Sequence, residues 1–195
     1  MSEISPPRRT HQASNAALAL AGVRRLARLD DRALLAAAGP ALRHVALPGR
    51  IEICARAPWI LVDGAHTAAS ARALAATLRR LPRRRSHLVL SVSAGKDLAA
   101  ICGALVPEAD VVTVTRAEAV RSLDPQRIAD AVRALQGRAE VRVVPNPHLA
   151  LRAAREALRD DELLCVSGSF YLAGIARRIL REPPRKRTPE PAPRV

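Results

Sequence analysis

The stretch WILVDGAHTAASARAL, residues 59–74, runs from an apolar block through DGAH into small and apolar residues at helical spacing. An uninterrupted apolar block of this length is typical of a strand that is buried on both faces of a sheet. A strand that passes directly into a helix is the repeating unit of an α/β domain. The turn between them places an acid, Asp63, and an imidazole, His66, close together where the strand ends.

The same alternation of strand and helix continues along most of the chain. Apolar blocks predict strands at 51–55, 59–63, 87–92, 111–115, 141–145 and 163–167. Helical patterns lie between them, at about 67–80, 97–105, 125–135, 147–158 and 170–181. Asp124 and Asn146 each precede a proline, which is a typical start of a helix. The sequence therefore predicts a Rossmann-like α/β fold with a mostly parallel six-stranded sheet and helices on both faces.

A short helical segment precedes this alternation. Apolar residues recur at helical spacing over 11–29, and two consecutive aspartates then cap a second helix, predicted at 32–38. A Pro-Gly pair at 48–49 breaks the chain before the first strand. We expect residues 1–10 to form a disordered leader, and the Pro- and Arg-rich residues 182–195 a disordered tail.

The composition limits the class of protein. At 195 residues, 49% of them hydrophobic and only 2% aromatic, the chain predicts one aliphatic-cored domain, or one domain with a fragment of another. The formal net charge is +14, but its arginines are scattered through Ala- and Leu-rich segments, which favours a solvated surface over a binding patch. A contribution to binding an anionic ligand stays open. Nucleic-acid binding is disfavoured, because few aromatic side chains are available to stack on bases.

The cysteines and the apolar runs indicate a cytoplasmic protein. Cys54, Cys102 and Cys165 lie far apart inside apolar runs, with no CxxC pair, so we expect reduced core cysteines rather than a metal site. No apolar run approaches the roughly 20 residues of a membrane span, and the N-terminal residues lack the pattern of a signal peptide. We therefore expect no membrane partner.

Candidate functional residues lie where the predicted strands end, because ligands of open parallel sheets bind at the carboxyl ends of the strands. Helix N-termini at this edge favour anions. No GxxxxGK[ST] phosphate loop occurs in the chain, and no GxGxxG follows its first strands. The segments that follow the strands are rich in small residues, hydroxyls and charges, and are 63–67, 93–97, 115–116, 145–146 and 167–169.

Each candidate also has an interpretation without a ligand. Asp63 fits the cap of the helix that begins near Thr67, and His66 fits an exposed imidazole with ordinary partners. Residues 167–169 fit an ordinary helix cap, and Lys96 fits a solvated lysine at a helix start. The residues alone leave these alternatives open.

Several motifs together resemble one family. The motifs PGR, DGAH and SGS-F-Y occur in one reading frame, in order and with matching spacing, over about residues 11–181. The chain is similar to folylpolyglutamate synthase/dihydrofolate synthase, a member of the Mur ligase superfamily. The segments that carry the likeness are HQASNAALAL (11–20), LPGRIE (47–52), ILVDGAHTAASARAL (60–74), SAGKDLAAI (93–101), TRAEAVRSLDPQRIADAV (115–132) and LLCVSGSFYLAGIARRIL (163–180).

The resemblance implies a domain organisation and a reaction. Residues 11–46 would be the last helices of the central ATPase domain, and 47–181 the C-terminal glutamate-ligase domain. The family's N-terminal P-loop domain would be absent. The implied reaction uses ATP and Mg²⁺ to convert a folate or pteroate carboxylate into an acyl phosphate, which the amine of L-glutamate attacks. The magnesium ligands would lie in a separate N-terminal ATPase domain, and no metal site is expected in this chain.

The resemblance also implies roles for individual residues. Asn15 would contact adenine, since its amide both donates and accepts hydrogen bonds. Arg50 would reach phosphate or ribose oxygens of ATP with its guanidinium fork. Asp63 would accept hydrogen bonds from the ribose hydroxyls, and His66 would act as the catalytic imidazole near the terminal phosphate.

Three further residues would bind substrate. The Ser169 hydroxyl would help to seat the incoming glutamate, and Lys96 and Arg121 would be cations near an anionic substrate. One position departs from the family pattern, because Thr67 stands where the family usually has Asn after the histidine.

The motifs leave two principal functions open. The chain is either part of a folylpolyglutamate synthase-like ligase that is inactive without its ATPase domain, or a stand-alone, non-catalytic module that binds a nucleotide or an amino acid. A degenerate remnant without a ligand is a third possibility, against which the intact ligand edge argues.

Overall fold

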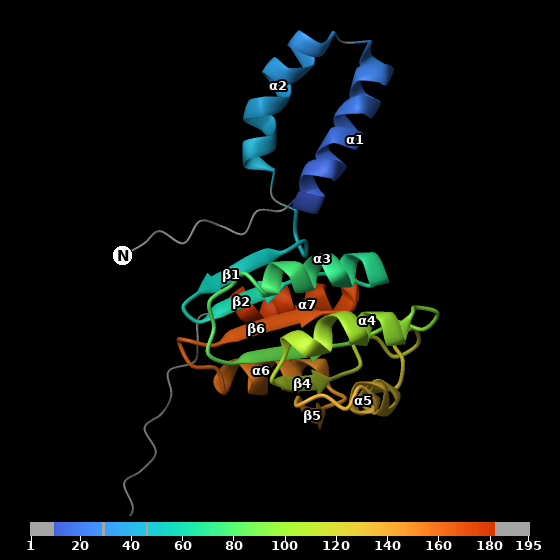
Figure 1. Ribbon diagram of the computed structural model, residues 1–195, viewed down its shortest axis with the longest axis vertical. Helices are drawn as coiled ribbons and strands as arrows, with labels where there is room; N and C mark the ends of the chain where they lie inside the picture. Colours follow the sequence, from blue (N-terminus) through green and yellow to red (C-terminus); the bar gives the residue numbers. More distant parts are fainter. Residues whose placement is uncertain (1–9, 29, 46, 182–195) are drawn as a thin grey trace, which may run out of the picture.

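The computed structural model describes residues 10–28, 30–45 and 47–181. The predicted tail 182–195, and the predicted leader except for its last residue, lie outside these ranges. A six-stranded sheet with helices on both faces forms the body, and two helices stand at one end of it (Figure 1). The elements in chain order are α1 (Thr10–Ala27), α2 (Asp31–His44), β1 (Glu52–Arg56), β2 (Trp59–Val62), α3 (Ala68–Leu78), β3 (Ser86–Leu90), α4 (Leu98–Leu105), the short 3₁₀ helix η1 (Val106–Glu108), β4 (Val111–Val114), α5 (Pro125–Ala134), β5 (Glu140–Val143), α6 (Pro147–Glu156), β6 (Leu163–Ser167) and α7 (Phe170–Arg181).

The sheet has the order β1-β2-β6-β3-β4-β5. All neighbouring strands are parallel except β1, which pairs antiparallel with β2. The exception follows from the connection, because only Ala57 and Pro58 separate these two strands and a parallel crossover needs a dozen residues or more. The predicted Rossmann-like α/β fold with a mostly parallel six-stranded sheet is confirmed.

Two apolar layers cover the sheet. One layer joins Leu61 of β2 to Leu74 of α3, Ile101 of α4 and Ile128 of α5. The other layer joins Ile60 and Val62 of the same strand to residues of α6 and α7. Adjacent residues of β2 therefore point into opposite layers, which explains why the strand is apolar at every position. Full burial of one such aliphatic side chain stabilises the fold by about 1.5–3 kcal/mol.

The helices of the body begin where the sequence predicts. The Asp124 side chain accepts a hydrogen bond from the backbone of Gln126, and the Asn146 side chain accepts one from the backbone of His148. α3 is capped by Thr67, whose hydroxyl accepts from the backbone of Ser70 in a reciprocal capping box. The N-cap of α3 is therefore Thr67 and not Asp63.

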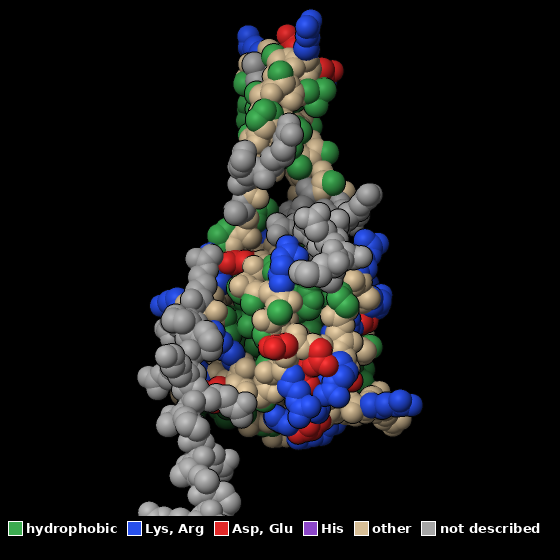
Figure 2. Space-filling view, turned by 90° about the vertical axis from the view of Figure 1, so that its left-hand side faces the viewer, with side chains coloured by type: hydrophobic (Ala, Val, Ile, Leu, Met, Phe, Trp, Pro, Cys, Tyr) green, Lys and Arg blue, Asp and Glu red, His purple; other side chains and the backbone are tan. Residues whose placement is uncertain are grey.

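The two N-terminal helices contact each other and lie apart from the sheet (Figure 1). α2 is longer than the predicted 32–38, since it continues to His44 with Pro40 inside it. Burial of Leu34 and Ala38 stabilises the helix despite the proline. Many other apolar side chains of this helical pair are exposed, as Figure 2 shows at the top of the molecule. Within the described ranges, no helix is long and apolar enough to cross a lipid bilayer.

No disulfide joins the three cysteines within the described ranges. Cys102 and Cys165 are buried, whereas Cys54 is partly buried. Burial raises the pKa of the Cys102 thiol to about 11, and it raises the pKa of Cys165 as well. Both thiols are therefore protonated and unreactive at neutral pH.

A buried titratable pair lies at the amino-terminal edge of the sheet. His87 of β3 and Glu162, directly before β6, are 6% and 3% exposed. His87 Nε2 is 3.3 Å from Glu162 Oε2, but among the described residues this nitrogen has no hydrogen-bond partner. Burial lowers the pKa of His87, and Arg85 and Arg142 lower it further, while the Glu162 carboxylate opposes them. The imidazole is thus held neutral in the folded chain.

This pair predicts a loss of stability in mild acid. Because folding lowers the pKa of His87, the unfolded chain binds a proton at a higher pH than the folded chain does. The contribution of His87 to the free energy of unfolding is therefore fully present above about pH 6.5 and decreases as the pH falls below that value. The slope contributed by one histidine is at most about 1.4 kcal/mol per pH unit. Urea unfolding at several pH values between about 7.5 and 5.5 measures this slope. His87→Gln is expected to flatten the dependence, and the matched change at exposed His148, His148→Gln, to leave it unchanged; equal slopes in all three proteins would contradict the assignment.

Candidate functional site

The carboxyl ends of β2 and β6 bring three segments to one edge of the sheet. The backbone N–H of Asp63 donates to the carbonyl of Val166 at 2.9 Å, which joins the ends of the two strands. The backbone N–H of Gly64 donates to the carbonyl of Gly49 at 2.7 Å, which brings the turn before β1 to the same place. The motifs PGR, DGAH and SGSFY, far apart in the sequence, therefore meet at this edge.

The Asp63 carboxylate holds two of these segments together. One oxygen accepts a hydrogen bond from the backbone N–H of Ile51 at 2.6 Å, and the other accepts one from Ala65 at 2.7 Å. Only 5% of Asp63 is exposed. Bonds from backbone donors to an ionised carboxylate are among the stronger hydrogen bonds in proteins. Asp63 therefore fixes the turn before β1 against the turn after β2.

The turn before β1 is strained and tied down. Ile51 has a φ of +47°, a conformation that is rare for a β-branched residue and costs about 1–3 kcal/mol. Its side chain is 1% exposed in the core, and its N–H is held by Asp63. Glu52 accepts from the backbone N–H of Gly49 at 2.8 Å and pairs with Arg177 of α7 at 2.7 Å. These contacts present Arg50, between Gly49 and Ile51, at the edge of the sheet.

His66 is oriented by the same turn. Its Nδ1 lies 2.8 Å from the carbonyl oxygen of Gly64. A carbonyl can only accept, so Nδ1 carries the proton and Nε2 of the neutral ring is left as an acceptor. The backbone N–H of His66 donates to the Ser70 hydroxyl at 3.2 Å. The ring is half-buried and its second nitrogen is available to a ligand.

Phe170, the first residue of α7, lies between these groups. The Arg50 guanidinium carbon is 4.4 Å from the centroid of its ring, and the His66 ring centroid is 5.1 Å away at a tilt of 57°. The next residue, Tyr171, accepts a hydrogen bond from the Arg121 guanidinium at 2.7 Å. Phe170, Tyr171 and Arg177 were not among the predicted site residues, although Phe170 and Tyr171 are the only phenylalanine and the only tyrosine of the chain.

The predicted substrate residues lie at the same edge in different environments. Ser169 is 1% exposed and its hydroxyl accepts from the backbone N–H of Tyr171 at 3.1 Å, as a helix cap does. Lys96 is exposed in the turn before α4 and, within the described residues, forms no ion pair. Arg121 is exposed on the segment between β4 and α5. The backbone N–H of Ala94 donates a hydrogen bond to the backbone carbonyl of Arg121 at 2.6 Å, which joins this segment to the turn that contains Lys96.

Asn15 is placed differently from the other candidates. It is exposed in the second turn of α1, on the helical pair rather than at the carboxyl edge.

In the described part of the chain, no group of three or more His, Cys, Asp or Glu side chains could hold a metal ion.

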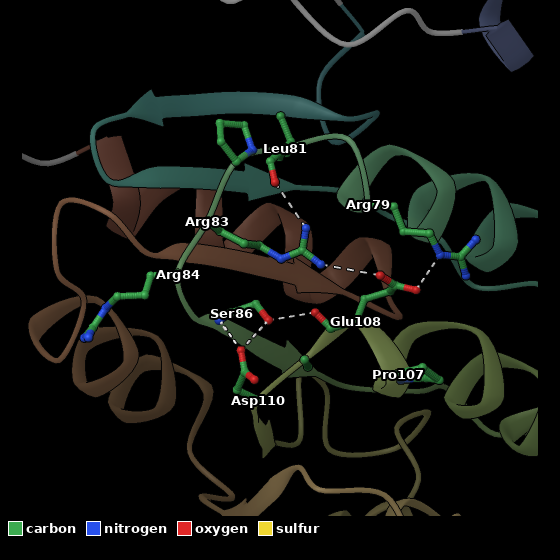
Figure 3. A pocket seen from close by; sticks show the side chains of 10 residues that line it. Arg79, Leu81, Arg83, Arg84, Ser86, Pro107, Glu108 and Asp110 are labelled. Atoms are coloured by element: carbon green, nitrogen blue, oxygen red, sulfur yellow. Dashed lines mark hydrogen bonds and ion pairs between the residues drawn. The ribbon is translucent and has the colours of Figure 1, made fainter.

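A pocket of about 420 Å³ lies at the opposite edge of the sheet, near the amino ends of β3 and β4 (Figure 3). The charged groups of the pocket have partners within the chain. Glu108 pairs with Arg79 at 2.7 Å and with Arg83 at 3.4 Å, and Asp110 accepts from the backbone and the hydroxyl of Ser86. Charged side chains that are paired in this way stabilise the fold, so we do not take this pocket as the candidate site.

Comparison with known proteins decides the family. The family described as Mur ligase, glutamate ligase domain, matches residues 49–170. The chain belongs to this family. The resemblance inferred from PGR, DGAH and SGS-F-Y is thereby confirmed.

Individual relatives agree with this membership. The dihydrofolate synthase/folylpolyglutamate synthase of Mycobacterium tuberculosis is 34% identical over 194 residues, which cover 89% of this chain and 39% of the relative. The crystal structure of the folylpolyglutamate synthase of that organism, complexed with ADP and AMPPCP, is 34% identical and superposes with a TM-score of 0.75 over 90% of this chain and 41% of that one. The structure of Escherichia coli FolC in complex with DHPP and ADP has a TM-score of 0.71 at 24% identity over 85% of this chain and 38% of that one, which shows the shared fold. The chain thus spans about two fifths of the length of the relatives it matches.

The two hydrogen bonds that the Asp63 carboxylate accepts predict that Asp63→Asn strongly destabilises the fold. The amide keeps the size of the carboxylate, but its NH₂ group faces a backbone donor, so the N–H of Ile51 or Ala65 loses its acceptor. We expect the free energy of unfolding to fall by about 2–3 kcal/mol in urea titrations. Asp97→Asn is the matched control, because Asp97 caps α4 at an exposed site and asparagine caps as well as aspartate. Equal stability of both variants would show that Asp63 does not hold the turns.

Proposed function

We propose that this chain is the glutamate-ligase part of an ATP-dependent ligase that adds L-glutamate to a folate or pteroate carboxylate through an acyl phosphate. The juxtaposition of Arg50 and His66 around Phe170, at the ligand edge of a Mur ligase domain, carries the proposal. A half-exposed guanidinium and an imidazole with a free nitrogen suit the polyphosphate of a nucleotide.

Arg50 and His66 have the most direct roles in this proposal. Arg50 makes no ion pair within the described residues, so its N–H donors are available to phosphate or ribose oxygens. His66 directs Nε2 away from Gly64, where it can accept from, or when protonated donate to, groups at the terminal phosphate. Both side chains stabilise and orient charge, and neither is needed as a nucleophile.

Asp63 contributes mainly through position. In this proposal Asp63 would accept a hydrogen bond from a ribose hydroxyl in addition to those from the backbone N–H groups of Ile51 and Ala65. Its larger effect is to hold the turn that carries Arg50 against the turn that carries His66.

The remaining candidates complete the substrate side. Lys96 and Arg121 are exposed cations on two joined segments of the ligand edge, where the carboxylates of glutamate would bind. Ser169 would seat the glutamate through its hydroxyl at the start of α7. Asn15 would contact adenine from the exposed surface of α1.

ATP would supply the phosphoryl group in this reaction. The folylpolyglutamate synthase of Mycobacterium tuberculosis was crystallised with ADP and AMPPCP, which supports the use of a nucleotide in the proposed reaction. A magnesium ion would be held by the ATPase domain in this proposal. The cations of this chain would then neutralise phosphate charge from one side only.

A partner domain is also proposed, on the basis of the helical pair. We assign residues 11–46 to the end of an ATPase domain and 47–181 to the ligase domain. Leu18, Leu26 and Leu35 on this pair are 76%, 87% and 65% exposed. Apolar side chains exposed in this number mark a surface that another protein surface covers. An ATPase domain that carries the phosphate loop would cover it and would bring the loop to Arg50.

The test is reconstitution with a separately expressed ATPase domain, such as that of the Mycobacterium tuberculosis relative. We expect the chain alone to release no phosphate, and the mixture to release phosphate only when glutamate and a folate are present. Arg50→Lys should lower kcat/KM for ATP by about 10- to 100-fold, because lysine loses the bidentate fork. Arg127→Lys, on the exposed side of α5, should leave the rate unchanged.

Two results would contradict this function. If neither the mixture nor a fusion of the two parts releases glutamate-dependent phosphate, the ligase assignment is wrong. Tight binding of ATP or glutamate by the isolated chain, measured by calorimetry, would instead favour a stand-alone binding module.

A further inference from the structure

The placement of the single phenylalanine is not explained by the core. The core of this chain is aliphatic, and Phe170 lies at the ligand edge with 44% of its surface exposed. It opens α7 directly after Gly168, and Tyr171 beside it is 45% exposed. Large aromatic side chains gain most from burial, so an exposed position at a ligand edge requires another reason.

The ring of Phe170 is in contact with three parts of the site. Arg50 lies over the ring, 4.4 Å from its centroid, and His66 meets it at 5.1 Å. Gly64 lies so close that a Cβ atom there would be 2.4 Å from Phe170 Cδ1. The glycine of DGAH therefore makes room for the ring, and the ring packs on the backbone between the two functional side chains.

An aromatic partner restrains an arginine differently from a carboxylate. A carboxylate would occupy the N–H donors of Arg50 and cancel its charge. A ring attracts the guanidinium through its π face, and it leaves the donors and the positive charge available to an anion. The described residues place no carboxylate on Arg50, so the ring is the restraint that the structure provides.

We propose that Phe170 is a positioning residue, which holds Arg50 and His66 in one arrangement before an anionic ligand binds. The ring lowers the freedom of both side chains, so less conformational entropy is lost when phosphate oxygens are bound. Its restraint on the two side chains stands by itself, whereas its effect on nucleotide binding rests on the proposed function. Tyr171 restrains Arg121 in a parallel way, through its hydroxyl at 2.7 Å.

The first test uses the complete chain without a ligand. ¹⁵N relaxation of the arginine Nε–H groups measures the mobility of each guanidinium, and Arg50→Lys assigns the signal of Arg50 by its loss. We expect Phe170→Leu to mobilise Arg50 and leave Arg121 unchanged. Tyr171→Leu is the matched control, and we expect it to mobilise Arg121 and leave Arg50 unchanged. If Arg50 is as rigid in Phe170→Leu as in the parent chain, the inference is wrong, whatever the function.

The second test uses the reconstituted enzyme of the proposed function. Phe170→Leu should weaken ADP binding by about 3- to 20-fold, the range expected for the loss of one cation–π contact. Phe170→Tyr keeps the ring and should restore binding to within about twofold, because the half-exposed site leaves the added hydroxyl in water. Arg50→Lys combined with Phe170→Leu should be non-additive, since both act through one contact.

The two tests separate the inference from the function. A mobile Arg50 in Phe170→Leu, together with no nucleotide binding by any reconstituted form, would leave the restraint established and overturn the ligase assignment. Equal ADP affinity of Phe170→Leu and the parent enzyme would overturn the positioning role. Failure of Phe170→Tyr to restore binding, with its melting temperature unchanged, would also overturn it.

Discussion

The candidate site depends on one carboxylate, that of Asp63, which accepts the backbone N–H of Ile51 at 2.6 Å and that of Ala65 at 2.7 Å. The first bond reaches back to the strained turn before β1, and the second closes the turn after β2. A buried ionised carboxylate is costly unless its lone pairs are satisfied, so these bonds and the burial of Asp63 require each other. Through them, Arg50 and His66 become parts of one rigid edge rather than side chains on two independent loops.

The two edges of the sheet use charge in opposite ways. At the amino-terminal edge, Glu108 is paired with Arg79 and Arg83, so the charge is compensated within the chain. At the carboxyl edge, Arg50 lies over an aromatic ring and keeps its hydrogen-bond donors available. A positive potential beside the N-termini of helices favours an anionic ligand. The carboxyl edge therefore suits an anion better than the amino-terminal edge, although the clearer pocket lies at the latter.

The elements of the fold were largely predictable because they follow from local patterns. Continuous apolar blocks predicted six strands, and the proline after Asp124 and the proline after Asn146 marked the starts of α5 and α6. Two features were not predicted. α2 continues beyond the predicted span to His44 with Pro40 inside it, and β1 runs antiparallel to β2 because the turn that joins them is too short for a parallel crossover. The direction of β1 is decided by the connection between two elements rather than by periodicity within one.

The sequence by itself determined an α/β domain of the Mur ligase family and the positions of Asp63 and His66 directly after β2. It left open whether Asp63 caps a helix or serves the site. Only the tertiary structure decided that Thr67 caps α3 and that Asp63 accepts a hydrogen bond from Ile51, and only it brought Phe170 into contact with both Arg50 and His66. The physical reason is range: strand and helix patterns arise between near neighbours, whereas these contacts join segments that meet only after the sheet has assembled.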